Sequence, residues 1–357
     1  MSRALEKEVV AFLKSGDHTA VYEDISRALA PPDDPSNDPA GLLEIEILGR
    51  SHPTPPGQNL LQDKNAIGIP KLRLVQAFLV AHQIARAHTN TTEQAENDIL
   101  SATAVMLLMD AENLTAANTR KRILLSRIKR LENGRISSLQ HRDCRILLYQ
   151  ESWFVDSLLT SRLHRHTKSP TLWSHRRWLV EQHRNFGHAV DIRAGFDIVK
   201  TAGEWHPRNY YAWCHARWLL KISRHVLTKE DILSLENSIE VWSLAHHDDI
   251  SGWSMLAHIQ EMRGDNAARL NVFRNLLDTA EGYRWTNESV WWYLRTTAAT
   301  LDLQIEDLDH FKTTHHKLLN EPDNNGDHAS TSHRVLETAW QWYNQNRGKA
   351  SSGIIGG

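Results

Sequence analysis

Apolar residues recur at helical spacing through much of this chain. In residues 2–30 the apolar positions are Val9, Val10, Phe12, Leu13, Val21, Ile25 and Leu29. The same spacing returns in residues 71–88, 94–111, 188–205 and 229–247. A recurrence every three or four residues places apolar side chains along one side of a helix, so the pattern predicts helices in these segments.

The pattern breaks between residues 31 and 70, where Pro, Gly, Asn and Asp are frequent. These residues favour turns, and only LLEIEIL, residues 42–48, has the apolar content of an ordered element. We therefore expect a long loop or insertion at 31–70, after an N-terminal helical segment at 1–30. A helical repeat domain then spans 71–345, and a flexible tail of small residues follows at 346–357.

Five predicted helix starts repeat along the chain. Each has a polar residue and, four residues later, a position that we call the anchor. The polar residues are Asn113, Ser169, Asn209, Asp249 and Asn287, and the anchors are Ala117, Trp173, Trp213, Trp253 and Trp291. From Trp173 the intervals are 40, 40 and 38 residues, whereas the first interval of 56 indicates an insertion. A fixed period in this range is typical of stacked helical pairs.

Physical chemistry explains the motif. A short polar side chain before a helix accepts a hydrogen bond from an otherwise unpaired amide of the first turn, and Pro170 follows its cap where the missing N–H costs nothing. Cations lie three or four residues after the anchors, at Arg120, Lys121, Arg176, Arg177, Arg217 and Arg295. We expect the tryptophans to be structural and these cations to reach carbonyls or carboxylates of the next pair. The predicted fold is all-α, a right-handed alpha-alpha superhelix, a crescent solenoid of antiparallel helix pairs.

Composition excludes several functions. With 41 basic and 43 acidic residues the chain has no basic excess, which argues against nucleic acid as a partner. Its two cysteines, Cys144 and Cys214, exclude a disulfide framework and fit a reducing compartment. No apolar stretch is long enough for a transmembrane segment, and the first residues lack a signal-peptide pattern, so we expect a cytoplasmic protein.

The chain has twenty-one histidines, but no metal-binding frame contains them. The pairs His164/His166, His246/His247 and His315/His316 occur without an HExxH or CxxC motif, so we predict no metal site and assign them to packing or solvent. Phosphate-binding glycine loops and a GxSxG elbow are also missing from the sequence. Residue chemistry alone therefore favours a helical-repeat binding scaffold over a self-contained enzyme.

Two cations stand directly before predicted helix caps. Lys168 precedes Ser169, and Arg208 precedes Asn209, each five residues before its tryptophan. Positive side chains beside helix N-termini favour an anion such as a diphosphate. Solvated charges at the rim of the repeats would also explain the pair.

The segments KSPTLWSHRRWLVE and HPRNYYAWCHARWLL resemble the protein prenyltransferase alpha-subunit repeat, and the similarity covers about residues 105–300. The resemblance implies a crescent of helical pairs around a beta subunit that holds the catalytic zinc, with no cofactor bound by this chain. It also implies that Lys168 reaches the isoprenoid diphosphate. Arg208, Asn209, Tyr210 and Tyr211 fall at substrate-binding positions of the shared cleft.

The chain departs from the family at several positions. Pro170 and Thr171 replace a tyrosine and a glutamine near the substrates, Tyr211 replaces a histidine, and Ala117 replaces the first tryptophan. The sequence is most similar to a divergent branch, the prenyltransferase alpha-subunit repeat-containing proteins. That branch implies the alpha subunit of a type III geranylgeranyltransferase, paired with a Rab geranylgeranyltransferase-type beta subunit.

Two hypotheses follow from the sequence. The first is a prenyltransferase subunit that supports geranylgeranyl transfer from its diphosphate to a C-terminal cysteine of an acceptor protein, for which a farnesylated SNARE is one candidate. The second is a non-catalytic helical-repeat scaffold for protein–protein interaction. Retention of Lys168 favours the enzyme, and the changes at Pro170 and Thr171 favour the scaffold.

Overall fold

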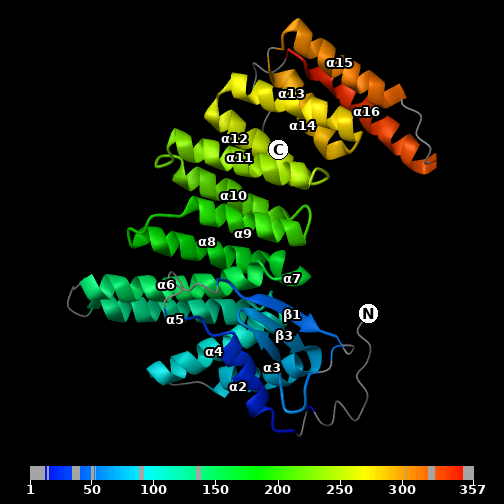
Figure 1. The fold of residues 1–357 in the computed structure, drawn as a ribbon. Coiled ribbons are helices and arrows are strands. Elements are labelled where there is room, and N and C mark those ends of the chain that lie inside the picture. The colour runs from blue at the N-terminus through cyan, green and yellow to red at the C-terminus, as the bar shows by residue number, and fades with distance from the viewer. Residues whose placement is uncertain are drawn as a thin grey trace. The chain divides into compact units, whose positions relative to one another are not determined.

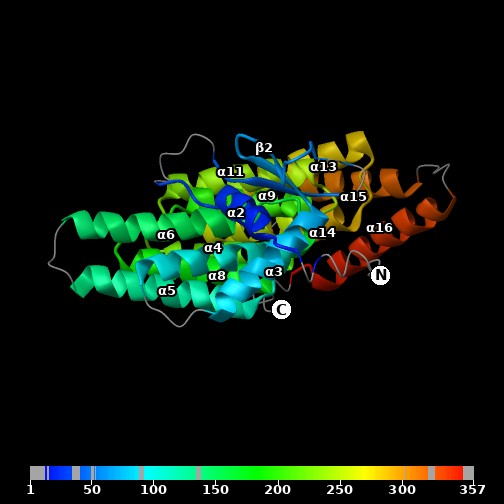
Figure 2. The same cartoon turned by 90° about the horizontal axis from the view of Figure 1, so that it is seen from below.

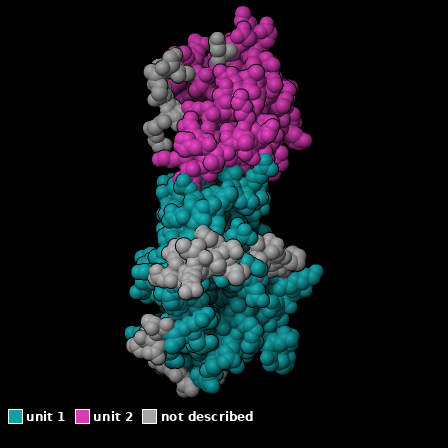
Figure 3. All heavy atoms as spheres, turned by 90° about the vertical axis from the view of Figure 1, so that its left-hand side faces the viewer, with its two compact units in different colours: residues 1–219 teal, residues 220–357 magenta. Residues whose placement is uncertain are grey.

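The computed structural model of the chain is mostly helical, with one small sheet near the N-terminus (Figure 1). It describes residues 13, 16–33, 41–49, 52, 54–87, 92–133, 138–301, 303–320 and 326–348. The chain divides into two compact units, residues 1–219 and 220–357, which Figure 3 shows in different colours. Each unit is described by itself below.

Unit 1 contains the sheet, the helices up to α9 and most of α10, whose last four residues belong to unit 2. The strands are β1 (Glu44–Leu48), β2 (Leu61–Asp63) and β3 (Ala66–Pro70). The helices are α2 (Thr19–Ala28), α3 (Lys71–Ala87), α4 (Glu93–Met109), α5 (Leu114–Asn133), α6 (Ser138–Leu159), α7 (His164–Thr167), α8 (Pro170–Asn185), α9 (Ile192–Trp205) and α10 (Tyr210–Ser223). Sequential helices pack on one another, α3 on α4, α4 on α5 and α5 on α6, and the long α5 and α6 lie side by side in Figures 1 and 2.

Unit 2 consists of helices in its described part. They are α11 (Lys229–Ala245), α12 (Ile250–Arg263), α13 (Asn266–Tyr283), α14 (Glu288–Thr300), α15 (Ile305–Asn320) and α16 (Gly326–Asn346). Helix α12 packs on α11 and on α14, α14 packs on α16, and α13 packs on α15. A capping box begins α11, in which Thr228 and Asp231 each bond the other's backbone amide.

Helix α2 lies within the predicted N-terminal helical segment, residues 1–30. Helix α2 buries Val21 and Ile25, and Leu29 directly after it is also buried. These are the apolar positions that the helical spacing selected. Val9, Val10 and Phe12 of the same pattern lie outside the described residues, as does the tail from residue 349 onward.

The three-stranded sheet is a departure from the predicted all-helical fold. Strand β3 lies between β1, which pairs with it in parallel, and β2, which pairs antiparallel. The ordered stretch 42–48 was predicted and contains β1, but β2 and β3 were not predicted. Glycine and proline inside β3 are loop signals in a sequence. A Cβ at Gly68 would come 3.0 Å from the Leu48 side chain, so a larger residue there would require that side chain to move.

Candidate functional site

All five predicted helix starts are present. Helices α5, α8, α10, α12 and α14 each begin one residue after the polar residue that the sequence analysis selected. Four caps accept an amide from their own first turn: Asn113 from Ala116 (3.0 Å), Ser169 from Leu172 (3.0 Å), Asn209 from Ala212 (3.3 Å) and Asp249 from Ser251 (2.8 Å). The side chain of Asn287 makes no such bond. The capping prediction is therefore confirmed at four of the five positions.

Three caps also bond to the preceding repeat, a role that the sequence analysis did not identify. The bonds run from Ser169 Oγ to the Ala111 carbonyl (3.0 Å), from Asn209 Nδ2 to the Thr167 carbonyl (2.7 Å) and from Asn287 Nδ2 to the His247 carbonyl (2.7 Å). Each acceptor lies two residues before the cap of the preceding repeat. A hydroxyl or amide can donate such a bond, whereas an ionised carboxylate at Asp249 only accepts.

Two of the anchor tryptophans use the same carbonyls. Trp173, Trp213, Trp253 and Trp291 are at most 3% exposed. The indole of Trp173 donates to the Thr167 carbonyl at 2.8 Å, and that of Trp253 donates to the His247 carbonyl at 3.0 Å. The Thr167 carbonyl therefore accepts from Trp173 of its own repeat and from Asn209 of the next. Two repeats together fix the backbone directly before Lys168.

Two of the cations after the anchors form buried ion pairs with α6. Arg120 and Glu151 make two parallel bonds of 2.7 Å, and Arg120 also donates to the Leu100 carbonyl. Arg176 binds Asp156 at 2.7 Å. Both arginines reach carboxylates, and Arg120 also reaches a carbonyl, as expected. Arg176 of α8, however, binds the preceding helix α6 and not the next pair. Their role is structural. Burial pushes the pKa of Glu151 upward, but the adjacent Arg120 outweighs burial and holds it below its ordinary value.

Two histidines of the repeat are part of this core. His175 is fully buried with Nε2 3.2 Å from Glu151, and burial lowers its pKa to about 4. Burial also places the pKa of His215 well below its ordinary value, and its Nε2 lies 2.5 Å from Arg176 Nη1. Because arginine can only donate, His215 is the acceptor and is neutral. Both residues therefore have a packing role.

Lys168 is half-buried and directly follows α7. The Thr167 carbonyl before it is held by two side chains, and Ser169 after it is 1% exposed and caps α8. Both neighbours are thus fixed, so the position at which the lysine side chain leaves the backbone is fixed as well. Such placement is what a binding or catalytic cation needs.

Arg208 and the two tyrosines lie at the start of α10. Arg208 is exposed in a left-handed backbone conformation, with φ of 59°. Tyr210 and Tyr211 are 70% and 41% exposed, and their rings meet edge to face with centroids 5.4 Å apart. A hydrogen bond with Cys214 raises the pKa of Tyr210. Asn209 differs from these three because it is 1% exposed and its amide bonds only to backbone groups, which gives it a positioning role.

His164 and His206 lie beside Lys168 in these repeats. Their rings meet nearly perpendicularly with centroids 4.2 Å apart. Burial, followed by the charges of His164 and Lys168, lowers the pKa of His206 to about 4. The buried Nε2 of His206 has no hydrogen-bond partner in the described part of the chain. Lys168, His164 and His206, which we call the basic cluster, were not connected by the sequence analysis because forty residues separate the two histidines.

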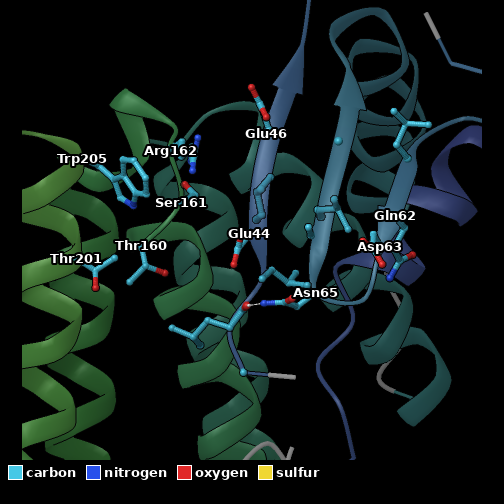
Figure 4. Close-up of a pocket in the computed structure, with 18 of the residues that line it drawn as sticks. Glu44, Glu46, Gln62, Asp63, Asn65, Thr160, Ser161, Arg162, Thr201 and Trp205 are labelled. Atoms are coloured by element: carbon cyan, nitrogen blue, oxygen red, sulfur yellow. Dashed lines mark hydrogen bonds between the residues drawn. The ribbon is translucent and has the colours of Figure 1, made fainter. Parts of the chain in front are cut away.

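A pocket of about 1030 Å³ opens elsewhere in unit 1, between the sheet and α9 (Figure 4). Glu44 and Glu46 line it from β1, while Arg162 and Trp205 lie on the opposite wall. Arg162 stacks over the Trp205 ring, 4.5 Å from its centroid. None of the predicted site residues lines this pocket.

The described residues contain no group of three or more His, Cys, Asp or Glu side chains that could hold a metal ion. No helix among them has the length and apolar content needed to cross a bilayer.

Two protein families match parts of the sequence. Residues 157–183 match the protein prenyltransferase alpha subunit repeat, and residues 172–279 match the ECM9 middle domain. No curated protein matches the chain. The repeat match runs from the end of α6 through α7 and most of α8, and it includes Lys168, Ser169 and Trp173. The chain therefore contains a helical repeat of the protein prenyltransferase alpha-subunit type.

Proposed function

We propose that this chain is the alpha subunit of a heterodimeric protein prenyltransferase and is active only with a beta subunit. One observation carries the proposal. Lys168 lies within the matched repeat, between a carbonyl that binds Trp173 and Asn209 and the buried cap Ser169. A cation placed so firmly beside a helix N-terminus suits the diphosphate of a prenyl donor.

In prenyl transfer the acceptor's cysteine loses its thiol proton to solvent, and its sulfur bonds to the first carbon of the isoprenoid. The carbon–oxygen bond breaks at the same carbon, and its electron pair leaves with the diphosphate. Lys168 would stabilise the negative charge that accumulates on that leaving group, and it would do so most strongly in the transition state. Arg208 and the exposed rings of Tyr210 and Tyr211 would line this chain's side of the shared cleft. The zinc that activates the sulfur would belong to the beta subunit.

The finer proposal is a type III geranylgeranyltransferase subunit, with a Rab geranylgeranyltransferase-type beta subunit and a farnesylated SNARE as one candidate acceptor. Resemblance to the divergent branch supports it, and so do the departures from the family's pattern. Thr171 stands where the family has a glutamine, and its hydroxyl donates to Glu112 at 2.6 Å. Ala117 replaces the first tryptophan and is buried. In this proposal the helical pairs of the chain form a right-handed superhelix around the partner.

The test is Lys168→Ala in the complex with the beta subunit. Loss of one charge-stabilising donor lowers kcat about 10²–10³-fold, and the amount of complex should stay unchanged. Lys168→Arg should recover part of the rate because it keeps the charge. Lys129→Ala is the matched control, since Lys129 is an exposed lysine of α5 away from the basic cluster. Transfer by Lys168→Ala at the normal rate would refute the catalytic role.

The alternative is a non-catalytic scaffold, which the exposed pair Tyr210 and Tyr211 also favours. Exposed tyrosines are common at the centre of protein interfaces. The two functions differ in the behaviour of the isolated chain. A scaffold should be monodisperse alone, whereas an obligate subunit exposes a large interface and should gain stability when the beta subunit is co-expressed.

A further inference from the structure

We infer that the pocket between the sheet and α9 binds an extended basic peptide segment of a partner protein. This pocket, which we call the sheet pocket, lies wholly within unit 1. The inference does not depend on prenyl transfer, because none of the residues proposed for that reaction lines it.

The sheet has one core face and one open face. Ile45, Ile67 and Ile69 are at most 2% exposed and form the core face. Successive residues of a strand point to opposite faces, so the residues between them point to the pocket. The register pairs Glu44 with Ala66 and Glu46 with Gly68 on this open face.

The open face is shaped as a trough. Ala66 of the central strand has a small side chain and forms part of its floor, whereas Leu48 of β1 lies over Gly68, 3.0 Å from the position of a Cβ there, and closes that end. Glu44 and Glu46 stand on one side of the central strand, and β2, whose residues are exposed, stands on the other with Asp63. Five residues of strand extend over roughly 17 Å, the length of an extended peptide of about the same number of residues.

The wall opposite the sheet is formed by one side of α9 and by the loop after α6. Asp197, Thr201 and Trp205 follow one another at intervals of four residues and therefore lie on the same side of α9. Trp205 is 38% exposed, which is unusual for the largest apolar side chain, and a partner's apolar residue could cover it. The volume of about 1030 Å³ exceeds what one or two side chains fill.

Charge identifies the class of occupant. Glu44, Glu46 and Asp63 of the sheet have no ion-pair partner in the described part of the chain, whereas Asp197 is paired with Lys200 at 2.8 Å. Among the described residues that line the pocket, Arg162 is the only cation. The carboxylates are spread over two strands rather than converging as metal ligands do. Separated carboxylates beside an exposed indole suit lysine or arginine side chains on an extended chain.

Binding of a labelled, terminally blocked eight-residue peptide of alternating lysine and valine to the full chain tests this inference. Fluorescence anisotropy should show saturable binding that weakens with salt, and the same peptide with glutamate in place of lysine should not bind. We expect Glu46→Lys and Trp205→Ala each to weaken binding at least tenfold. Glu23→Lys is the matched control, because Glu23 is an exposed glutamate of α2 outside the pocket. The affinity of this variant for the peptide should stay within twofold of that of the wild type.

Three results would overturn the inference. The first is equal binding by the wild type and Glu46→Lys, which would place the peptide elsewhere. The second is complete competition by micromolar spermine, which would make the pocket a polyamine site. The third is that the peptide does not bind and a cross-linking probe at Gln62 reacts with residues 1–12 of the same chain. The occupant of the pocket would then be this segment of the chain and not a partner protein.

Discussion

The bond from Asn209 to the preceding repeat makes a quantitative prediction. Asn209→Ala removes an N-cap that contributes about 1 kcal/mol to the free energy of unfolding. It also removes the 2.7 Å bond to the Thr167 carbonyl, in a site where Asn209 is 1% exposed. That bond contributes about another 1–2 kcal/mol, because Thr167 keeps Trp173 as a donor and is not left unsatisfied. The predicted loss is therefore about 2–3 kcal/mol.

The control is Asp191→Ala, because Asp191 caps α9 through Ala194 at 3.0 Å in an exposed position without a second bond to another repeat. It should lose about 1 kcal/mol, the cap alone. Asn209→Asp separates the two roles of the residue. It keeps the cap acceptor but points a carboxylate at the Thr167 carbonyl, so it should be at least as destabilising as Asn209→Ala.

Urea unfolding followed by circular dichroism and by tryptophan fluorescence measures these differences. With a slope of about 2–3 kcal/mol per molar, the midpoint for Asn209→Ala should fall by about 1 M. A loss no larger than that of Asp191→Ala would refute the argument that the caps stabilise the stack of repeats.

The buried charges make two further predictions. Glu151→Gln leaves Arg120 buried without its counter-ion and should lower the free energy of unfolding by about 3–5 kcal/mol. Glu181→Gln, at an exposed ion pair, should lower it by at most about 1 kcal/mol. Equal losses of the two variants in thermal unfolding would contradict this prediction. Because the pKa of His175 falls from 6.5 to about 4 on folding, the unfolded chain binds more protons between these values and stability decreases as pH falls through this range. At pH 5 this residue alone should lower the free energy of unfolding by about 2 kcal/mol. His175→Gln should therefore reduce the loss of stability between pH 7 and 5, whereas His225→Gln, at an exposed site, should not.

The helix starts were predictable because each signal is local. A polar cap and a large apolar residue four positions later interact within one turn, so their spacing is visible in the sequence. This is why α8, α10 and α12 begin where the sequence analysis placed them. A second reason for serine or asparagine at the cap could not be seen in the sequence. Serine and asparagine also donate to a carbonyl about forty or more residues earlier, and such a contact depends on stacking.

The sheet could not be predicted for a related reason. Gly68 and Pro70 are turn signals by themselves, and their role in β3 follows only from pairing with β1 and from the approach of Leu48. The sheet pocket depends on the same pairing, together with α9, more than a hundred residues later. Its residues gave no motif in the sequence.

The candidate anion site stays a prediction. Lys168 was selected by its place before a cap, and its backbone is held on both sides. The proximity of His164 and His206 was not predicted, because the two histidines lie far apart in the sequence. Their proximity arises when α7 and the end of α9 pack together. Asn209 was predicted as a substrate contact, and the structure gives its amide to the backbone instead.

The most direct test of the central claim is co-expression of the chain with each prenyltransferase beta subunit of the same organism. Co-purification is scored first, and transfer of a labelled isoprenoid to proteins with C-terminal cysteines is scored second. The account predicts a stable complex with the Rab geranylgeranyltransferase-type subunit and geranylgeranyl transfer that depends on Lys168. A chain that pairs with none of the beta subunits and is stable alone would contradict it and favour the scaffold.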